Sequence, residues 1–404
     1  MTSTTTSASG RSSTQQAVKG GSITPAREQK VVEAVPKGLF IGGTWVDAEG
    51  GATFEVHDPS TGAVLCTVAD ATPADGRRAL EAAVAAQESF AAVPPRQRAD
   101  MLMRAFELLH ERIEDLALLM TLEMGKPLAD SRGEIAYAAE FFRHFAEEAV
   151  RIRGNYQTAP AGGARFLVTR QPVGPCILIT PWNFPMAMGT RKIGPAIAAG
   201  CTMVMKPASQ TPLSMLALAQ ILEQSGLPGG VLNVITSSSS GKTMEPLIRD
   251  PRARKLSFTG STEVGRMLLE QASEQILKVS MELGGNAPFL IFEDADLDAA
   301  VEGALLAKMR NIGEACTAAN RFHVAEPVAR EFADRLAERM SGLKVGRGTE
   351  QDVKVGPLIN QDAVDKVSEL VEDARDKGAK VVVGGHAREG RGYFYEPTVI
   401  TGVA

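Results

Sequence analysis

No stretch of the sequence is apolar for the roughly 18 residues that a membrane-spanning helix needs, because charged residues, glycine or proline interrupt every candidate. Cysteine is scarce: Cys66, Cys176, Cys201 and Cys316 stand far apart, and the five histidines are scattered. Neither residue type shows metal-ligand spacing, so we expect no metal site. With no apolar leader and no paired cysteines, we expect a protein of the reducing cytoplasm, in which a chemically active cysteine serves as a nucleophile.

An excess of positive charge is also lacking. The sequence has 43 Lys and Arg residues against 48 Asp and Glu residues, which gives a net charge of -5. Binding to a phosphate backbone would need a local basic patch that the sequence does not show, so we expect no nucleic-acid partner. With 404 residues, 44% of them hydrophobic and 23% charged, the composition is that of a globular protein long enough for two or three domains.

The first 30 residues are dominated by Ser, Thr, Gly and Gln. Such a segment buries too little apolar surface to offset the entropy lost on ordering, so we predict a disordered tail at residues 1–30. Short strands are predicted at residues 39–46 and 53–56, where they form a small sheet that opens the folded part. Long helices are predicted between residues 72 and 151, because apolar residues recur there at three- and four-residue spacing.

Beyond residue 166, near-continuous apolar strands alternate with helices. This alternation is typical of parallel strands buried on both faces, so we predict a doubly wound α/β sheet. Another α/β pattern starts at residue 287, with helices near residues 297–309 and 327–343, and predicts a second lobe. Because ligands bind beyond the carboxyl ends of strands in open α/β sheets, we expect the chemistry in a cleft between the lobes.

Four polar clusters fall at predicted strand ends or loops, at residues 180–185, 206–209, 282–285 and 313–316. Each has an ordinary explanation when taken alone. Lys206 could be a solvated lysine, Asn183 a turn former, Glu282 a helix-cap carboxylate and Cys316 a small buried residue. Their combination favours one shared site over four unrelated roles.

Four strings together resemble the aldehyde dehydrogenase superfamily from about Leu39 to the last residue. They are TPWNFP at 180–185, SFTGST at 257–262, MELGG at 281–285, and Cys316 followed by Asn320-Arg321. The resemblance implies Cys316 as the nucleophile, Asn183 as an oxyanion donor and Glu282 as the general base. It also implies a set of cofactor-binding residues: Trp182, Lys206, Ser209, Gly260, Ser261 and Leu283.

The resemblance further implies an aldehyde-dehydrogenase-like α/β fold with three parts. Residues 31–153 and 173–282 would form a doubly wound parallel-sheet cofactor domain. Residues 154–172 would form a small projecting oligomerisation arm, and residues 283–404 a second α/β catalytic domain. We therefore expect a homo-oligomer, a dimer or a tetramer.

The chemistry of aldehyde oxidation agrees with these roles. A thiolate such as that of Cys316 adds to the carbonyl, and the resulting alkoxide needs donors, which the Asn183 amide and the Cys316 N–H could supply. After hydride leaves, a thioester remains, and its hydrolysis needs a carboxylate in a partly buried cleft to deprotonate water. Glu282 suits that step. Its presence favours release of a free acid over transfer to coenzyme A, because acylating relatives commonly lack that carboxylate.

The cofactor site has no GxGxxG fingerprint after a first strand. Instead, Gly260 and Ser261 end a predicted strand and start a helix, whose free N–H groups favour a pyrophosphate, although a plain turn is the alternative. Many NAD-using relatives carry a glutamate three residues beyond the position of Lys206, where this chain has Ser209. A carboxylate would repel a 2′-phosphate and a hydroxyl beside a lysine would accept it, so we expect NADP as the preferred cofactor, with NAD second.

Two arginines point to the substrate class. Arg191 lies eight residues after Asn183, and Arg310 lies six residues before Cys316. Taken alone, each would be interpreted as a surface arginine, but arginine binds a carboxylate bidentately. Both positions resemble those that hold the distal carboxylate in the semialdehyde dehydrogenases of the superfamily. We therefore expect short ω-oxo acids as substrates, succinate semialdehyde first and glutarate semialdehyde second.

Thr317 and Ala318 follow the nucleophile where related enzymes often carry a second cysteine, so no disulfide switch with such a neighbour is expected. The family continues well beyond the position of Ala404, which predicts an incomplete catalytic domain, in either a fragment or an impaired short form. Two competing interpretations remain. One is a non-catalytic chain that binds nucleotide or a full-length subunit. The other is a cysteine hydrolase that uses Cys316 with His323, although no third activating residue accompanies them.

Overall fold

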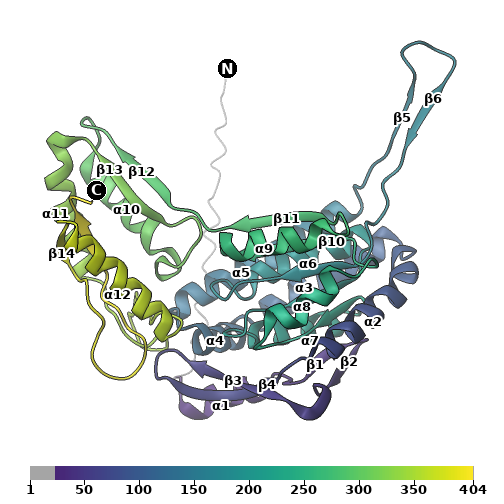
Figure 1. Ribbon diagram of the computed structural model, residues 1–404, viewed down its shortest axis with the longest axis horizontal. Coiled ribbons are helices and arrows are strands. Elements are labelled where there is room, and N and C mark those ends of the chain that lie inside the picture. The colour runs from purple at the N-terminus through teal and green to yellow at the C-terminus, as the bar shows by residue number, and fades with distance from the viewer. Residues whose placement is uncertain (1–22, 404) are drawn as a thin grey trace, which may run out of the picture.

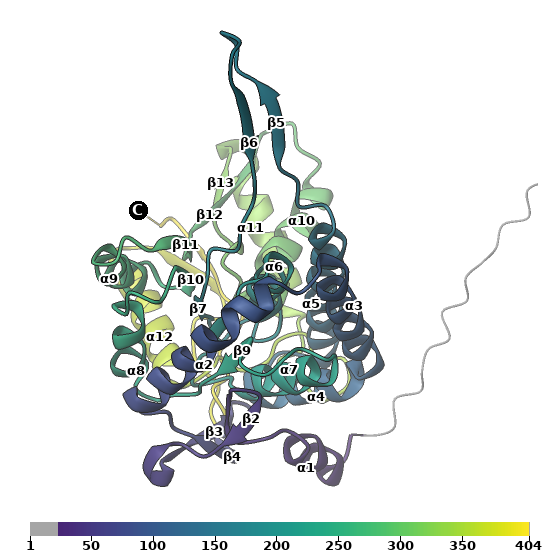
Figure 2. The same ribbon diagram turned by 90° about the vertical axis from the view of Figure 1, so that its right-hand side faces the viewer.

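The computed structural model describes residues 23–403. A large lobe with a central sheet carries a long projecting hairpin, and a smaller lobe formed by the C-terminal third of the chain lies beside it (Figure 1). Turning the molecule by 90° shows the hairpin standing clear of the helices around it (Figure 2). Within residues 23–403, no helix has both the length and the apolar character needed to cross a membrane.

A seven-stranded sheet forms the centre of the large lobe, in the order β11-β10-β7-β8-β9-β1-β2. Its parallel strands are β7 (Cys176–Ile179), β8 (Met203–Lys206), β9 (Leu232–Val234), β10 (Lys255–Gly260) and β11 (Lys278–Leu283). β1 (Leu39–Ile41) and β2 (Thr44–Val46) extend one edge in antiparallel fashion. The expected small opening sheet is therefore wrong for these two strands. Buried Phe40 of β1 pairs with Val234 of β9, far along the chain.

Helices cover both faces of this sheet, as the doubly wound prediction requires. They are α2 (Pro73–Ala91), α3 (Pro95–Glu111), α4 (Ile113–Met124), α5 (Leu128–Ala149), α6 (Ala187–Ala199), α7 (Leu213–Gln224), α8 (Ser240–Ile248) and α9 (Thr262–Ser273). Successive residues of β7 face opposite sides. Leu178 belongs to the core shared with α3 to α7, and Ile177 belongs to the core shared with α2, α8 and α9. The predicted parallel α/β fold is confirmed.

The N-terminal helix α1 (Pro25–Glu33) corrects the predicted tail. Thr24 caps it by accepting a hydrogen bond from the Arg27 N–H, and Pro25 occupies the first turn. Buried Val31 and Val32 join the core, which stabilises the helix. The prediction of disorder is thus wrong for the cap and helix at residues 24–30, because composition alone does not contain the helix-start signal. Residues 1–22 of the predicted tail lie outside the described residues.

Two hairpins lie outside the main sheet. β3 (Thr53–Asp58) pairs with β4 (Ala63–Ala69), next to the short 3-10 helix η1 (Glu49–Gly51). β5 (Asn155–Thr158) pairs with β6 (Arg165–Val168) and forms the projecting arm. Every residue of these two arm strands is exposed, and Leu167 is 72% exposed.

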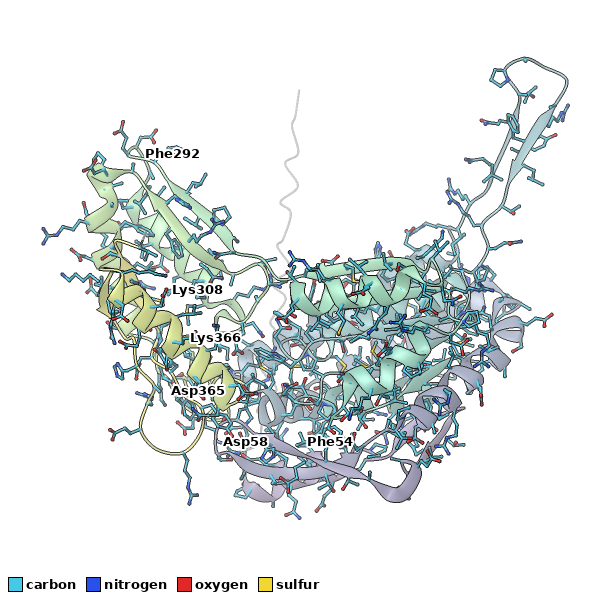
Figure 3. All side chains as sticks on the ribbon, viewed as in Figure 1. Phe54, Asp58, Phe292, Lys308, Asp365 and Lys366 are labelled. Atoms are coloured by element: carbon cyan, nitrogen blue, oxygen red, sulfur yellow. The ribbon has the colours of Figure 1, made fainter. Side chains whose placement is uncertain are left out.

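The smaller lobe contains two separate pairs of strands, where the sequence predicted one further α/β unit. β12 (Ala287–Ile291) and β13 (Ala319–Val324) are parallel, whereas β14 (Lys380–Val383) and β15 (Val399–Thr401) are antiparallel. Its helices are α10 (Leu297–Met309), the 3-10 turn η2 (Arg310–Gly313), α11 (Glu326–Ser341) and α12 (Gln361–Asp376). Apolar side chains remain on its surface, including Phe292, which lies at the outer tip of the lobe (Figure 3).

Candidate active site

A cavity of about 790 Å³ opens where the carboxyl ends of β7, β10 and β11 meet the loop that carries Cys316. Most of the predicted site residues line it: Trp182, Asn183, Arg191, Gly260, Ser261, Glu282, Leu283 and Cys316. The remaining three, Lys206, Ser209 and Arg310, are absent from its wall. The cavity therefore brings together residues from both lobes, at the place where an open α/β sheet presents its ligands.

Asn183 is held in the loop after β7 by its own side chain. Its Nδ2 donates a hydrogen bond to the main-chain oxygen of Glu314, at 2.7 Å. Because a carbonyl oxygen only accepts, the amide nitrogen must face it, which leaves the second N–H of this amide unused. The Asn183 Oδ1 is buried without a partner. Asn183 thus keeps one donor for a ligand in the cavity.

The Cys316 loop has an unusual backbone. Asn311 and Ile312 adopt left-handed φ angles of 54° and 53°, and a branched side chain such as that of Ile312 rarely tolerates this conformation. Gly313 continues the left-handed run at 85°. Cys316 follows in a turn, with its side chain exposed. The loop thus presents the thiol to the cavity rather than to the core.

Glu282 comes from β11, the edge strand of the large sheet, and is exposed. We expected the general base to be partly buried, and this expectation is wrong for Glu282. Within residues 23–403, no further strand pairs with the free edge of β11. Its neighbour Leu283 contacts α9 closely. A Cβ on Gly265 would lie 2.6 Å from the Leu283 Cδ2, so a larger residue there would require the Leu283 side chain to move.

A second carboxyl group, that of Glu314, lies in the cavity wall and was not predicted. Its Oε2 is buried and has no hydrogen-bond partner. Burial raises the pKa of Glu314 to about 8, although the nearby cations Lys126 and Lys308 oppose this shift. Its position two residues before the nucleophile was the available signal, but the burial depends on contacts that the sequence does not show.

The residues expected to hold the cofactor lie at the ends of β8 and β10. The Lys206 Nζ donates to Ser240 Oγ at 2.5 Å, and burial lowers the pKa of Lys206 to about 8. Ser209, three residues after Lys206, is half-buried, and its hydroxyl donates a hydrogen bond to the Gln210 side chain at 3.4 Å. Ser261 caps α9 by accepting from the Val264 N–H at 3.2 Å, which leaves earlier N–H groups of that helix for an anion. These donors fit the phosphate groups of a dinucleotide.

Two aromatic side chains of α5 lie between the two predicted substrate arginines and were not predicted. The guanidinium carbon of Arg191 lies 5.5 Å from the ring centroid of Phe141, and that of Arg310 lies 6.0 Å from the ring of Tyr137. The Tyr137 and Phe141 rings are 4.9 Å apart. Arg310 is also 6.0 Å from the ring of Phe184, which lines the cavity. The two cations thus flank one aromatic cluster beside the cavity.

The fold and this arrangement match a known class of enzymes. The model of the aldehyde dehydrogenase family matches residues 45–404. The chain therefore belongs to the aldehyde dehydrogenase family and is an oxidoreductase.

Individual relatives narrow the comparison. A succinate-semialdehyde dehydrogenase of Paenarthrobacter nicotinovorans is 59% identical over 340 residues, which cover 84% of this chain and 76% of that protein. A glutarate-semialdehyde dehydrogenase of Pseudomonas aeruginosa is 51% identical over 364 residues, covering 90% of this chain and 75% of that protein. The crystal structure of an NADP-dependent enzyme of E. coli superposes with a TM-score of 0.90 at 49% identity, covering 92% of this chain and 77% of that one.

Proposed function

We propose that the chain oxidises succinate semialdehyde, or a similar short ω-oxo acid, to the dicarboxylic acid with NADP. The observation that carries this proposal is that Cys316, Asn183 and Arg191 line one cavity. A nucleophile, an oxyanion donor and a cation for a distal carboxylate are the three groups that such a substrate needs. The names of the relatives support the same substrate class.

The first step is addition of the Cys316 thiolate to the aldehyde carbon. A C–S bond forms, and the carbonyl oxygen becomes an alkoxide. The unused N–H of the Asn183 amide and the Cys316 main-chain N–H would bind this oxygen. Because the Asn183 amide is already held by the Glu314 carbonyl, its donor would stabilise the developing charge without reorganising.

The second step converts the adduct to the acid. A bound nicotinamide cofactor would supply the hydride acceptor, and loss of hydride from the former aldehyde carbon would leave a thioester on Cys316. Glu282 would then take a proton from water as the water attacks the thioester, and the C–S bond breaks to regenerate the thiolate. Since Glu282 is exposed, it can pass this proton on to solvent.

The cofactor proposal concerns the residues after β8. The Lys206 ammonium and the Ser209 hydroxyl would bind the 2′-phosphate of NADP, and the N-terminus of α9 at Ser261 would bind the pyrophosphate. A Cβ on Gly260 would lie 2.4 Å from the Phe258 Cζ, and Gly260, Trp182 and Leu283 would contact the cofactor on the cavity side. NAD, which lacks the 2′-phosphate, remains the second choice.

The substrate proposal concerns the arginines. Arg191 is half-buried and lines the cavity, and Arg310 is exposed across the Tyr137 ring from it. Together they would hold the distal carboxylate of the substrate. Glutarate semialdehyde is one methylene longer and remains the second candidate, which the similarity to the Pseudomonas aeruginosa enzyme favours.

The test is formation of NADPH by the purified chain with succinate semialdehyde, with Cys316→Ser as the control. We expect turnover with the wild-type chain and none with the variant. Tight binding of NADPH without turnover would instead favour the competing interpretation, a non-catalytic chain that binds nucleotide. Ester hydrolysis that depends on His323 and needs no nucleotide would favour the cysteine hydrolase.

We also propose a division of labour among the parts of the chain. Residues 31–153 with 173–282 would bind the cofactor, residues 283–404 would carry the catalytic cysteine, and the arm at residues 154–172 would mediate self-association. Exposed apolar side chains on the arm support this role, since Tyr156 is 63% and Leu167 is 72% exposed. Light scattering should show an oligomer for the wild-type chain and a smaller species for Leu167→Asp. An unchanged mass would assign association to another surface.

A further inference from the structure

A buried lysine next to the cavity has no role in the chemistry described above. Lys126 follows α4, and its side chain has no exposed surface. It forms an ion pair with Glu134 of α5, whose side chain is 1% exposed, at 2.5 Å. Removing two charges from water is costly, and such a pair is tolerated only when its other hydrogen-bonding atoms find partners. The partners of Lys126 therefore indicate what the pair does.

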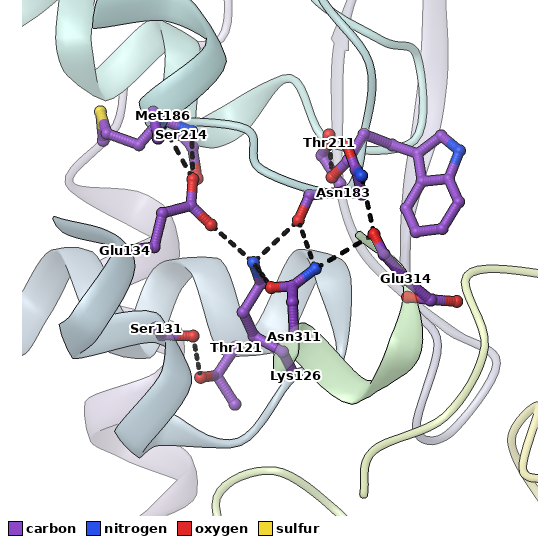
Figure 4. A network of polar contacts seen from close by, with 12 residues as sticks. Thr121, Lys126, Ser131, Glu134, Asn183, Met186, Thr211, Ser214, Asn311 and Glu314 are labelled. Carbon is purple, nitrogen blue, oxygen red and sulfur yellow. Dashed lines mark hydrogen bonds and ion pairs between the residues drawn. The ribbon is translucent and has the colours of Figure 1, made fainter. Parts of the chain in front are cut away.

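The Lys126 ammonium joins three elements that are distant in sequence (Figure 4). Besides the Glu134 Oε2, it donates to the main-chain oxygen of Asn183 at 2.8 Å and to the Asn311 Oδ1. An ammonium has three N–H donors, so all of them are used. The Phe184 ring, 4.6 Å from the Nζ, closes the remaining side. One cation thus ties the loop after β7 to the turn that precedes Cys316.

The partners of Lys126 extend this connection on both sides. The second oxygen of Glu134 accepts hydrogen bonds from the main-chain N–H groups of Met186 and Ala187, at 2.9 and 3.0 Å, and so holds the start of α6. The Asn311 Nδ2 donates to the same Asn183 oxygen at 3.0 Å. The Asn183 peptide is therefore held by two donors, and its side chain is held by the Glu314 carbonyl.

We propose that Lys126 is a positioning residue, whose ammonium holds the Asn183 loop against the Cys316 loop so that the free amide N–H points at the alkoxide. The inference rests on the proposed function and extends it to a residue outside the cavity wall. A lysine suits this task because one cation can bind three acceptors from different loops. An apolar residue of the same length would leave the Glu134 Oε2 and the Asn311 Oδ1 buried without their donor, and would leave the Asn183 oxygen with the Asn311 amide alone.

The test is Lys126→Met, which keeps the length of the side chain and removes its charge. We expect kcat for succinate semialdehyde to fall by roughly 10- to 100-fold with little change in KM, because an oxyanion donor acts mainly in the transition state. In the double variant with Asn183→Ala, kcat should equal that of Asn183→Ala alone. Residues that act through one another are non-additive in this way.

Alkylation of Cys316 by iodoacetamide supplies a second measurement. This displacement forms no alkoxide, so its rate should stay within about twofold of the wild-type rate in Lys126→Met. A merely structural role would disturb the thiol and slow alkylation along with turnover.

Glu123→Gln is the matched control. Glu123 is a buried carboxylate that holds the start of α7 by accepting hydrogen bonds from the Leu213 and Ser214 N–H groups. We expect the kcat of this variant to equal that of the wild type.

Two outcomes would overturn the inference: effects of Lys126→Met and Asn183→Ala that multiply, or alkylation that slows as much as turnover. If Lys126→Met does not fold, Asn311→Ala removes the bonds from Asn311 to Lys126 and to the Asn183 oxygen, and the same non-additivity with Asn183→Ala is expected. A wild-type chain that oxidises no aldehyde would reject the proposed function itself, before any variant is compared.

Discussion

The side-chain amide of Asn183 donates to the main-chain oxygen of Glu314 at 2.7 Å, across 131 positions of sequence. This bond joins the loop after the first strand of the parallel sheet to the loop that carries the nucleophile. The proposed oxyanion donor is therefore oriented by the segment that carries the attacking thiol, two residues before it. A change in either loop should alter the other.

Replacing Asn183 tests the oxyanion site. Asn183→Ala should raise the barrier by about 2.7–4 kcal/mol, a loss of roughly 10²- to 10³-fold in kcat, because one donor to the alkoxide disappears. KM should change much less, since the donor acts mainly after addition of the thiol. Steady-state kinetics with succinate semialdehyde measures both constants. If the variant raises KM and leaves kcat unchanged, Asn183 acts in substrate binding instead.

Replacing Glu282 tests the hydrolytic step. Glu282→Gln should leave acylation intact and slow the attack of water, so that the acyl-enzyme accumulates. Intact-protein mass spectrometry after mixing with aldehyde and NADP should show the added acyl group on Cys316, and rapid mixing should show a burst of NADPH. An unchanged steady-state rate would remove Glu282 from the mechanism.

The buried carboxyl of Glu314 should make stability fall as pH rises. Burial raises the pKa of Glu314 to about 8, from 4.5 for an unperturbed glutamate. Between these values the folded state binds one more proton than the unfolded state, so its contribution to stability is complete below pH 4.5 and is lost as pH rises to about 8.

In Glu314→Gln this loss should disappear, because the amide does not titrate. In denaturant unfolding, the free energy of unfolding of the variant should rise relative to that of the wild type by about 1.4 kcal/mol per pH unit across that window. Above the window the difference should stay constant. The two proteins should be similar near pH 4.5, where the wild-type carboxyl is protonated. Parallel stability curves for the two proteins would mean that Glu314 is ionised in the folded state.

Ser209 should decide the choice of cofactor. Ser209→Glu should weaken the binding of NADP by roughly tenfold or more. A carboxylate at this position would repel the 2′-phosphate and pair with Lys206 instead. Binding of NAD should hold or improve. The ratio of kcat/KM for the two cofactors measures the change, with Ser209→Ala as the control for loss of the hydroxyl alone. A glutamate variant that still favours NADP would refute this assignment.

Arg310 should contribute to substrate choice despite its exposure. Arg310→Ala should lower kcat/KM for succinate semialdehyde by about tenfold, the value of a charge-assisted hydrogen bond, and should leave a neutral aldehyde of similar length unaffected. Because solvent screens an exposed arginine, Arg191→Ala should have the larger effect of the two. Equal losses for both aldehydes would separate Arg310 from recognition of the carboxylate.

Much of the fold was predictable because its signals are local. The alternation of apolar strands and helices correctly predicted the doubly wound sheet, and the expected helix at residues 297–309 coincides with α10. The errors came from other sources. The start of α1 at Pro25 was missed because composition was considered without its cap, and the pairing of β1 with β9 depends on segments almost 200 positions apart.

The sequence by itself determined the family, because its motifs are short strings at strand ends that are recognisable without any contact. Only the tertiary structure decided the surroundings of the motif residues. It exposes Glu282, buries the Glu314 Oε2, and brings the aromatic rings of Tyr137 and Phe141 between the two arginines. Lys126 shows the reason most clearly. Its partners Asn183 and Asn311 lie 57 and 185 positions away, and no local pattern encodes a contact that forms only when three distant loops pack around one charge.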